Sequence, residues 1–389
     1  MAKRSKPDFS RREGEERVTP LELFFDLVFV FAITQVTGLV SAHPTWEGAA
    51  QGVIVLGLLW WAWTAYAWLT NTIDPEAGAV RLAIFGAMAA MLIASLAVPH
   101  AFGDDAMLFA GAYAVVRVAH LGLYAVAGRG DPELLGAIGR LARGSLPATA
   151  LLFVGASLGG WEQAAVWAVA GVIDLLGAYI GGGRGWHLAA GHFAERHGLI
   201  VIIALGESIV ALGAGTLGVP LTAGVVTAAA FGLAVAVALW WAYFDVVAIV
   251  AERKLREAEG SAQLAMARDS YSYLHLPMVA GIVFFAVGVK KTLAHVGDPL
   301  ETVPAVALCG GVALYLLSHV AFRLRNVRTL NKRRLVVAAG LLALIPAAVA
   351  LPALATLALV AAVTAGLIAY EAIRFAEARD RVRQALTPG

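Results

Sequence analysis

Two acidic side chains lie in the first apolar stretch of the chain, residues 20–41, which is long enough to cross a bilayer. Asp26 and Glu22 are four residues apart, so a helix carries both on one face. A third acid, Glu207, lies near the centre of a second apolar stretch, residues 198–215. A carboxylate in hydrocarbon costs at least ~2.5 kcal/mol unless it meets a partner or a watery cavity. These acids predict proton- or cation-binding sites. The alternative is that Asp26 pairs with a basic loop residue, Glu22 lies at the membrane interface and Glu207 hydrogen-bonds a neighbouring helix.

Basic side chains inside the apolar segments are candidate charge partners. Arg117 and His120 are three residues apart and share a helix face, and Arg117 needs a buried counter-ion. His120 is a candidate proton shuttle because imidazole titrates near neutral pH, with a simple hydrogen bond as the alternative. Lys290 lies at the outer end of an apolar segment, where it attracts an anion or reaches the headgroups. The candidate counter-ions of Arg117 are Asp26, Asp174 and Glu207. The predicted ion- or proton-coupling acids are Asp26, Glu207, Glu22, Asp174 and Asp245.

Three histidines suggest a metal site only weakly. His187, His192 and His197 are spaced by five residues, whereas zinc-binding helices space their histidines by four. The single cysteine, Cys309, excludes a disulfide framework within the chain and a zinc site built on cysteines. We find no nucleophile–base pair, so the sequence predicts no catalytic residue, metal or cofactor.

The elements that carry these residues are membrane helices. The chain is 60% hydrophobic and only 14% charged, whereas soluble domains carry about 25% charged residues. Counting ~20 apolar residues per crossing predicts an all-α polytopic membrane protein with about twelve transmembrane helices. The predicted spans are 20–41, 48–70, 79–98, 105–127, 145–161, 163–182, 198–215, 221–249, 271–290, 303–322, 334–351 and 353–373.

Charge in the loops sets the orientation. With twelve spans, nearly all of the 29 Lys and Arg residues fall in loops on one side together with both ends of the chain. This bias predicts that both termini are cytoplasmic. Residues 251–270 carry opposite charges three and four apart and read as a cytoplasmic surface helix. The formal net charge is only +2, so no nucleic-acid partner is expected.

The spacing of matched residues indicates an internal repeat. Asp26 and Glu207 are separated by almost the same number of residues as the tryptophan pairs that begin at Trp60 and Trp240. Six spans per copy give two parallel repeats related by an axis along the membrane normal. The predicted parts are a cytoplasmic tail at 1–17, a first six-helix repeat at 18–182, a cytoplasmic linker at 183–197, a second repeat at 198–375 and a second tail at 376–389.

Two strings carry a family resemblance: LELFFDLVFVFAIT in the first span, and HFAERHGL at 192–199, which continues into IIALGESIVALG. They resemble the bacterial low temperature requirement A (LtrA) family over almost the whole chain. The resemblance implies a many-helix protein of the bacterial inner membrane, and the family name describes a growth phenotype. The first span also resembles, more weakly, the Phe-Ser-Asp motif of potassium channels built from six-helix repeats. Phe25 replaces the serine, and the second copy reads Gly206-Glu207-Ser208.

Three hypotheses follow. The first is a proton- or cation-linked transporter or channel, with Asp26 and Glu207 as equivalent sites in the two repeats. The second is a membrane-embedded enzyme acting on a lipid or lipid-linked substrate, with the histidine-bearing segment as its site. The third is a structural or sensory membrane protein whose buried charges are simply paired. The sequence favours the first and a non-enzymatic role. The candidate partners are the lipid bilayer, an unidentified small ion or solute and a second copy of the chain.

Overall fold

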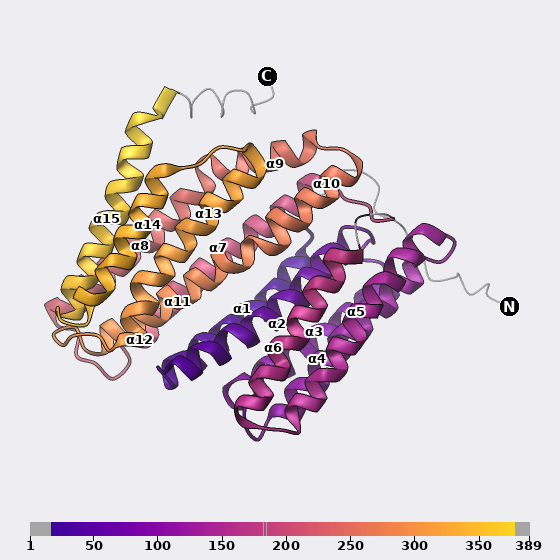
Figure 1. Ribbon diagram of the computed structural model, residues 1–389, viewed down its shortest axis with the longest axis horizontal. Coiled ribbons are helices and arrows are strands. Elements are labelled where there is room, and N and C mark those ends of the chain that lie inside the picture. The colour runs from indigo at the N-terminus through magenta and orange to yellow at the C-terminus, as the bar shows by residue number, and fades with distance from the viewer. Residues whose placement is uncertain (1–16, 182, 184, 378–389) are drawn as a thin grey trace. The chain divides into compact units, whose positions relative to one another are not determined.

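The computed structural model describes residues 17–181, 183 and 185–377 (Figure 1). In these residues the regular structure is helical, apart from isolated bridge residues such as Pro299 and Pro352. The helices of the amino-terminal part are α1 (Pro20–Ala42), α2 (Trp46–Thr70), α3 (Gly78–Ala97), η1 (Val98–His100), α4 (Ala106–Ala127), α5 (Pro132–Ala156) and α6 (Gly160–Gly181). The later helices are α7 (Ala190–Gly215), α8 (Ala223–Phe244), α9 (Val247–Glu257), α10 (Gly260–Met266), the π-helical η2 (Ala267–Tyr273), α11 (His275–Ala294), α12 (Thr302–Ala305), the π-helical η3 (Val306–Gly310), α13 (Gly311–Val327), α14 (Lys332–Ala348) and α15 (Ala353–Arg374). The expected all-α class is confirmed.

The chain divides into two compact units. The first unit takes the described parts of residues 1–39, 50–196 and 258–267, and the second takes those of 40–49, 197–257 and 268–389. Helix α7 therefore contributes its first residues, up to Arg196, to the first unit and the rest to the second. The predicted cytoplasmic tails, 1–17 and 376–389, lie almost wholly outside the described residues.

Ten of the described helical segments are long and apolar enough to cross a membrane. Each of the twelve predicted spans overlaps a helix, but α5 and α14 are not among these ten. Helix α5 begins at Pro132, well before the expected residue 145, and so includes Arg140 and Arg143. Helix α14 has 17 residues and opens on three basic side chains. Large apolar side chains such as Leu82 and Ile180, which are 71% and 80% exposed, suit the helices to a lipid environment.

Helix starts carry recognisable caps. The Asp131 side chain accepts from the backbone N–H groups of Glu133 and Leu134 at the start of α5, and Pro132 occupies the first helical position. The Thr222 hydroxyl accepts from the N–H of Val225 at the start of α8. These bonds satisfy donors that have no partner inside the helix.

Glycines allow the closest helix contacts. A Cβ added to Gly144 of α5 would lie 2.9 Å from the Cα of Gly177 on α6. In the second unit, a Cβ on Gly288 of α11 would lie 2.6 Å from the Cα of Leu308 in η3. Small residues at such points let helix backbones approach each other, as membrane helices commonly require.

Helix α9 forms the first part of the expected charged surface helix at 251–270, which the structure divides between α9, α10 and η2. Arg253 and Lys254 each lie 2.7 Å from a carboxylate oxygen of Glu257, and Arg256 lies 2.8 Å from Glu252. These pairs join residues three and four apart on an exposed face.

Candidate functional site

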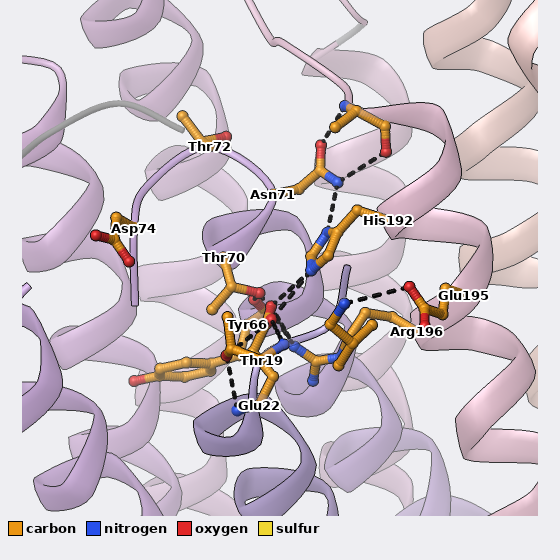
Figure 2. A network of polar contacts seen from close by, with 12 residues as sticks. Thr19, Glu22, Tyr66, Thr70, Asn71, Thr72, Asp74, His192, Glu195 and Arg196 are labelled. Atoms are coloured by element: carbon orange, nitrogen blue, oxygen red, sulfur yellow. Dashed lines mark hydrogen bonds and ion pairs between the residues drawn. The ribbon is translucent and has the colours of Figure 1, made fainter. Parts of the chain in front are cut away.

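A buried polar network in the first unit joins the start of α1 to the start of α7 (Figure 2). Arg196 donates from Nη1 to Oε1 of Glu22 at 3.0 Å and from Nη2 to Oδ1 of Asp26 at 2.6 Å. His192 Nε2 lies 2.9 Å from Oε1 of Glu22. All four side chains are at most 1% exposed. Because Glu22 and Asp26 are four apart, and His192 and Arg196 are also four apart, each helix offers its pair on one face.

Glu22 is deeply buried within the protein, in the first turn of α1. Besides Arg196 and His192, the backbone N–H and the hydroxyl of Thr19 donate to its Oε2 at 2.9 and 3.1 Å. A carboxylate that accepts this many bonds is held as an anion by its surroundings. The burial has a simple cause, because Glu22 is in the first turn of α1 and faces α7 rather than solvent.

Only one of the two carboxylate oxygens of Asp26 is hydrogen-bonded within the described residues. Its Oδ1 accepts from Arg196 and, at 2.8 Å, from the indole N–H of Trp63 on α2. Its Oδ2 is buried and has no hydrogen-bond partner among the described residues. A buried acceptor left unbonded is rare in native structures and needs an explanation.

Asn71 fixes the protonation of His192. The side-chain oxygen of Asn71 accepts from the N–H of Ala189 at 2.7 Å, and its amide nitrogen donates to the carbonyl of Ala189 at 3.1 Å. The amide orientation is thereby set, and the same nitrogen lies 3.0 Å from Nδ1 of His192. Since an amide NH₂ only donates, Nδ1 must accept, and the ring proton belongs on Nε2, facing Glu22. His192 is therefore the neutral tautomer that donates to Glu22.

The four side chains named above carry unequal numbers of negative and positive charges. With His192 neutral, two carboxylates share the single guanidinium of Arg196, so these four side chains sum to one negative charge. A small cavity of about 10 Å³ is lined by Glu22, Arg196, Tyr66 and Thr70, among others. Such a volume is about that of one water-sized probe. An unbalanced charge with so little water beside it is costly unless something compensates it.

A second buried pair in the same unit is balanced. Arg117 on α4 lies 2.8 Å from Oδ2 of Asp174 on α6, and it also donates to the hydroxyl of Ser145 on α5. Of the three counter-ions considered for Arg117, the structure selects Asp174. His120 is fully buried with its ring packed against Tyr66 and Tyr124, at centroid separations of 5.7 and 5.0 Å.

The remaining predicted residues belong to the second unit. Glu207 is 2% exposed on α7. Asp245 follows the last residue of α8, and Lys290 lies near the end of α11; both are half-buried. The structure thus brings Glu22 and Asp26 together and pairs Arg117 with Asp174. The other three predicted residues, Glu207, Asp245 and Lys290, belong to the second unit.

The three histidines considered as metal ligands have separate neighbours. His187 is exposed and lies 3.9 Å from Asp131, and His192 bonds to Glu22 and Asn71. The ring of His197 contacts the rings of Tyr271 and His275 in the second unit. In the part of the chain that the structure describes, no three His, Cys, Asp or Glu side chains gather as a candidate metal site.

The sequence prediction missed Arg196, the residue that bonds both acids of the network. The segment 192–197 is polar and was assigned to a cytoplasmic linker, but α7 begins at Ala190 and includes it. One signal was available: His192 and Arg196 have the same four-residue spacing as Glu22 and Asp26, which predicts two complementary helix faces.

Comparisons with known proteins agree with this architecture. The family model of the bacterial low temperature requirement A protein (LtrA) matches residues 17–369. The chain is 33% identical over 310 residues to a Rhizobium meliloti (strain 1021) protein named "Uncharacterized protein RA0937", across 76% of this chain and 74% of that protein. No solved structure matches it significantly. The family match includes the whole buried network, from Glu22 to Arg196. This chain belongs to the bacterial low temperature requirement A (LtrA) protein family.

Proposed function

We propose that this protein is a proton- or cation-linked transporter or channel of the bacterial inner membrane, and that the Glu22–Asp26–His192–Arg196 network is its coupling site. The observation that carries the proposal is the unbonded Oδ2 of Asp26, a buried carboxylate that shares the guanidinium of Arg196 with Glu22. One proton or one monovalent cation at that oxygen neutralises the group. Loading and unloading of this site would accompany transport.

The two acids have different roles in this proposal. Glu22 accepts from Arg196, His192 and Thr19, so its negative charge is well compensated in place. Asp26 accepts only on Oδ1, so a proton added to Oδ2 breaks no existing bond. We therefore assign exchange of the ion to Asp26 and positioning of Arg196 to Glu22.

The Arg117–Asp174 pair offers a useful contrast. One guanidinium meets one carboxylate at 2.8 Å, so the pair is neutral without any added ion. A neutral buried pair suits a structural role between α4, α5 and α6, and we assign no coupling to it.

Glu207 is proposed as the corresponding acid of the second repeat. Support comes from a matched contact inside each unit. The ring of Tyr66 on α2 lies 5.7 Å from that of His120 on α4, and the ring of Tyr243 on α8 lies 5.8 Å from that of His319 on α13. In both cases a tyrosine near the end of the tryptophan-rich helix packs on a histidine two membrane helices later. Tyr66 follows Trp60 by six residues and Tyr243 follows Trp240 by three, so the contact recurs on corresponding helices and not at identical positions. The recurrence at the level of helices favours two copies of one ancestral unit.

The proposal is tested by ion flux in proteoliposomes. Purified protein is reconstituted, and proton and monovalent-cation movement is followed under an imposed voltage or pH gradient. The native chain is compared with Asp26→Asn and Glu207→Gln. We expect flux in the native chain and a loss of about tenfold or more in Asp26→Asn, since the amide cannot take up a proton or hold a cation at that position.

The matched controls are Asp104→Asn and Glu162→Gln, which make the same chemical changes at exposed carboxyls. They should leave flux unchanged. If both buried acids can be replaced without changing the flux of any ion that the native chain moves, the assignment of the site is wrong. Absence of flux from a folded native chain under either gradient would overturn ion-linked transport and favour a non-transporting role for the buried pairs.

A further inference from the structure

A cavity of about 600 Å³ lies within the second unit, where the ends of α8 and α15 meet the start of α14. Its lining includes Trp241, His319, Arg334 and Phe375. The volume is that of a small-molecule binding site. The charge bias of the loops predicts that this end of the unit faces the cytoplasm.

The lining is basic. Arg323, Lys332, Arg333 and Arg334 all line the cavity, against the two acids Asp245 and Glu371. Glu371 is committed to Arg334, with Oε2 2.8 Å from Nη2. Among the described residues, Lys332 and Arg333 form no ion pair with any carboxylate, so the lining retains an excess of positive charge.

The positions of these cations are unfavourable for the helix itself. Lys332 and Arg333 are the first residues of α14, and the amino-terminal end of a helix carries partial positive charge. A bound anion would reverse this repulsion, since unpaired N–H groups and cations at a helix start both favour negative charge.

A buried histidine beside the cavity supplies an unbonded donor. Arg334 Nη1 lies 3.0 Å from Nδ1 of His319, and because arginine only donates, Nδ1 must accept. The proton of the neutral ring is then on Nε2, which is buried and has no partner among the described residues. His319 is 1% exposed and lines the cavity, so its unbonded N–H group is the nearest buried donor that a ligand in the cavity could satisfy.

Apolar and aromatic groups complete the lining. Trp241, Leu330 and Phe375 lie on it together with valines of the α8–α9 junction. The guanidinium of Arg333 sits over the rings of Tyr370 and Phe375, at 5.2 and 5.1 Å. The cavity thus has cations and an N–H donor on one part of its lining and apolar side chains on another. This combination is complementary to a phospholipid, which has an anionic phosphate group and apolar acyl chains.

We propose that this cavity binds the phosphate headgroup of an anionic phospholipid, with Lys332 and Arg333 at the phosphate and His319 as an added donor. Basic pockets between membrane helices suit such headgroups. The proposal concerns a different unit from the coupling site and does not depend on transport.

The test uses the full chain purified in dodecyl maltoside. Thermal melting and native mass spectrometry are recorded with short-chain phosphatidylglycerol, with phosphatidylcholine of the same chain length, and with inorganic phosphate. We expect phosphatidylglycerol to raise the melting temperature and remain bound, and phosphatidylcholine and phosphate to do so far less. Equal effects of the two lipids would overturn the proposal, as would inorganic phosphate acting as strongly as the lipid.

The double variant Lys332→Gln/Arg333→Gln should bind phosphatidylglycerol more weakly, by about fivefold for each cation removed. Both side chains are exposed, and removing cations from a helix start does not weaken the helix, so the variant should fold. The matched control, Arg253→Gln/Lys254→Gln, removes two exposed cations of α9 that do not line the cavity and should bind normally.

A second variant tests the N–H donor of His319. His319→Phe keeps an aromatic ring against Tyr315 and Tyr243 but removes the N–H group. We expect several-fold weaker phosphatidylglycerol binding in a folded protein. Unchanged binding in both His319→Phe and the double variant would overturn the assignment of the cavity.

Discussion

Nη2 of Arg196 lies 2.6 Å from Oδ1 of Asp26, although the two residues are 170 positions apart in the chain. The same guanidinium lies 3.0 Å from Glu22 through its other terminal nitrogen. One side chain at the start of α7 therefore holds two acids of α1. The stability of the first unit should depend on it more than on either acid alone.

Replacing Arg196 by Gln should destabilise the protein strongly. It leaves two buried carboxylates without their cation, and breaking a buried ion pair in this way costs about 3–5 kcal/mol. Thermal unfolding in detergent should show a clearly lower midpoint. The double variant Arg196→Gln/Asp26→Asn should recover part of the loss, because one of the stranded charges is gone. A double variant no more stable than Arg196→Gln alone would contradict this account.

The two acids should respond differently to neutralisation. Glu22→Gln removes an anion that Arg196, His192 and Thr19 all bond, so it should lose about 1–3 kcal/mol of stability. Asp26→Asn keeps an acceptor for Arg196 and Trp63 and replaces an oxygen that has no partner, so its melting temperature should stay close to that of the native chain. Melting both variants side by side checks the difference. The reverse order of stability would contradict the roles assigned to the acids.

The Arg117–Asp174 pair should behave as a coupled unit. Arg117→Met and Asp174→Leu should each cost about 3–5 kcal/mol, since each strands the other charge. Combining them removes both charges and should cost much less than the sum. A double-mutant cycle on unfolding free energies measures this coupling, and strict additivity would show that the two side chains do not interact.

Gly144 should not accept a side chain. In Gly144→Ala the new Cβ would lie 2.9 Å from the Cα of Gly177, and overpacking of this kind costs about 1–3 kcal/mol. Gly139 lies on the same helix and has open space where a Cβ would go. Gly139→Ala is therefore the matched control and should be neutral or slightly stabilising, because alanine favours helix. Equal melting temperatures of the two variants would argue against the close contact of α5 and α6.

The predicted orientation can be checked by labelling single cysteines. In a Cys309→Ala background, a cysteine at Leu217, in the turn after α7, should react with a membrane-impermeant maleimide added outside intact cells. A cysteine at Thr329, between α13 and α14, should react only after permeabilisation. Both positions are exposed, so access to reagent decides the result. The opposite pattern would invert the topology that the loop charges predict.

The sequence was sufficient for the helical architecture because the length of an apolar segment is a direct consequence of the thickness of the bilayer. It also identified Glu22 and Asp26 as one face of α1 and included Asp174 among the partners of Arg117. It did not find Arg196 or Asn71. A prediction from hydropathy begins a helix at the first apolar residues. Helix α7 instead begins at Ala190, in a polar segment whose Arg196 pairs with acids far away in the chain.

The cavity in the second unit was also outside the reach of the sequence. The sequence predicts only that Lys332 and Arg333 are cytoplasmic charges, and it gives no reason to link them to His319. Their common cavity depends on how the ends of α8, α14 and α15 pack, and these segments are far apart in the chain. Pairings between remote segments leave no periodic pattern in a single sequence.

The bond between Arg196 and Asp26 also constrains how the protein is made. Membrane helices enter the bilayer in order of synthesis, so α1 is present long before the ribosome has produced Arg196. Throughout that interval the two acids of α1 lack the guanidinium that holds them in the finished protein. Nascent α1 is consequently a marginal segment that must stay at the headgroup boundary, take up protons, or be sheltered by the insertion machinery. Biogenesis of the first unit is complete only when the start of α7 has been synthesised and Arg196 bonds the two acids of α1.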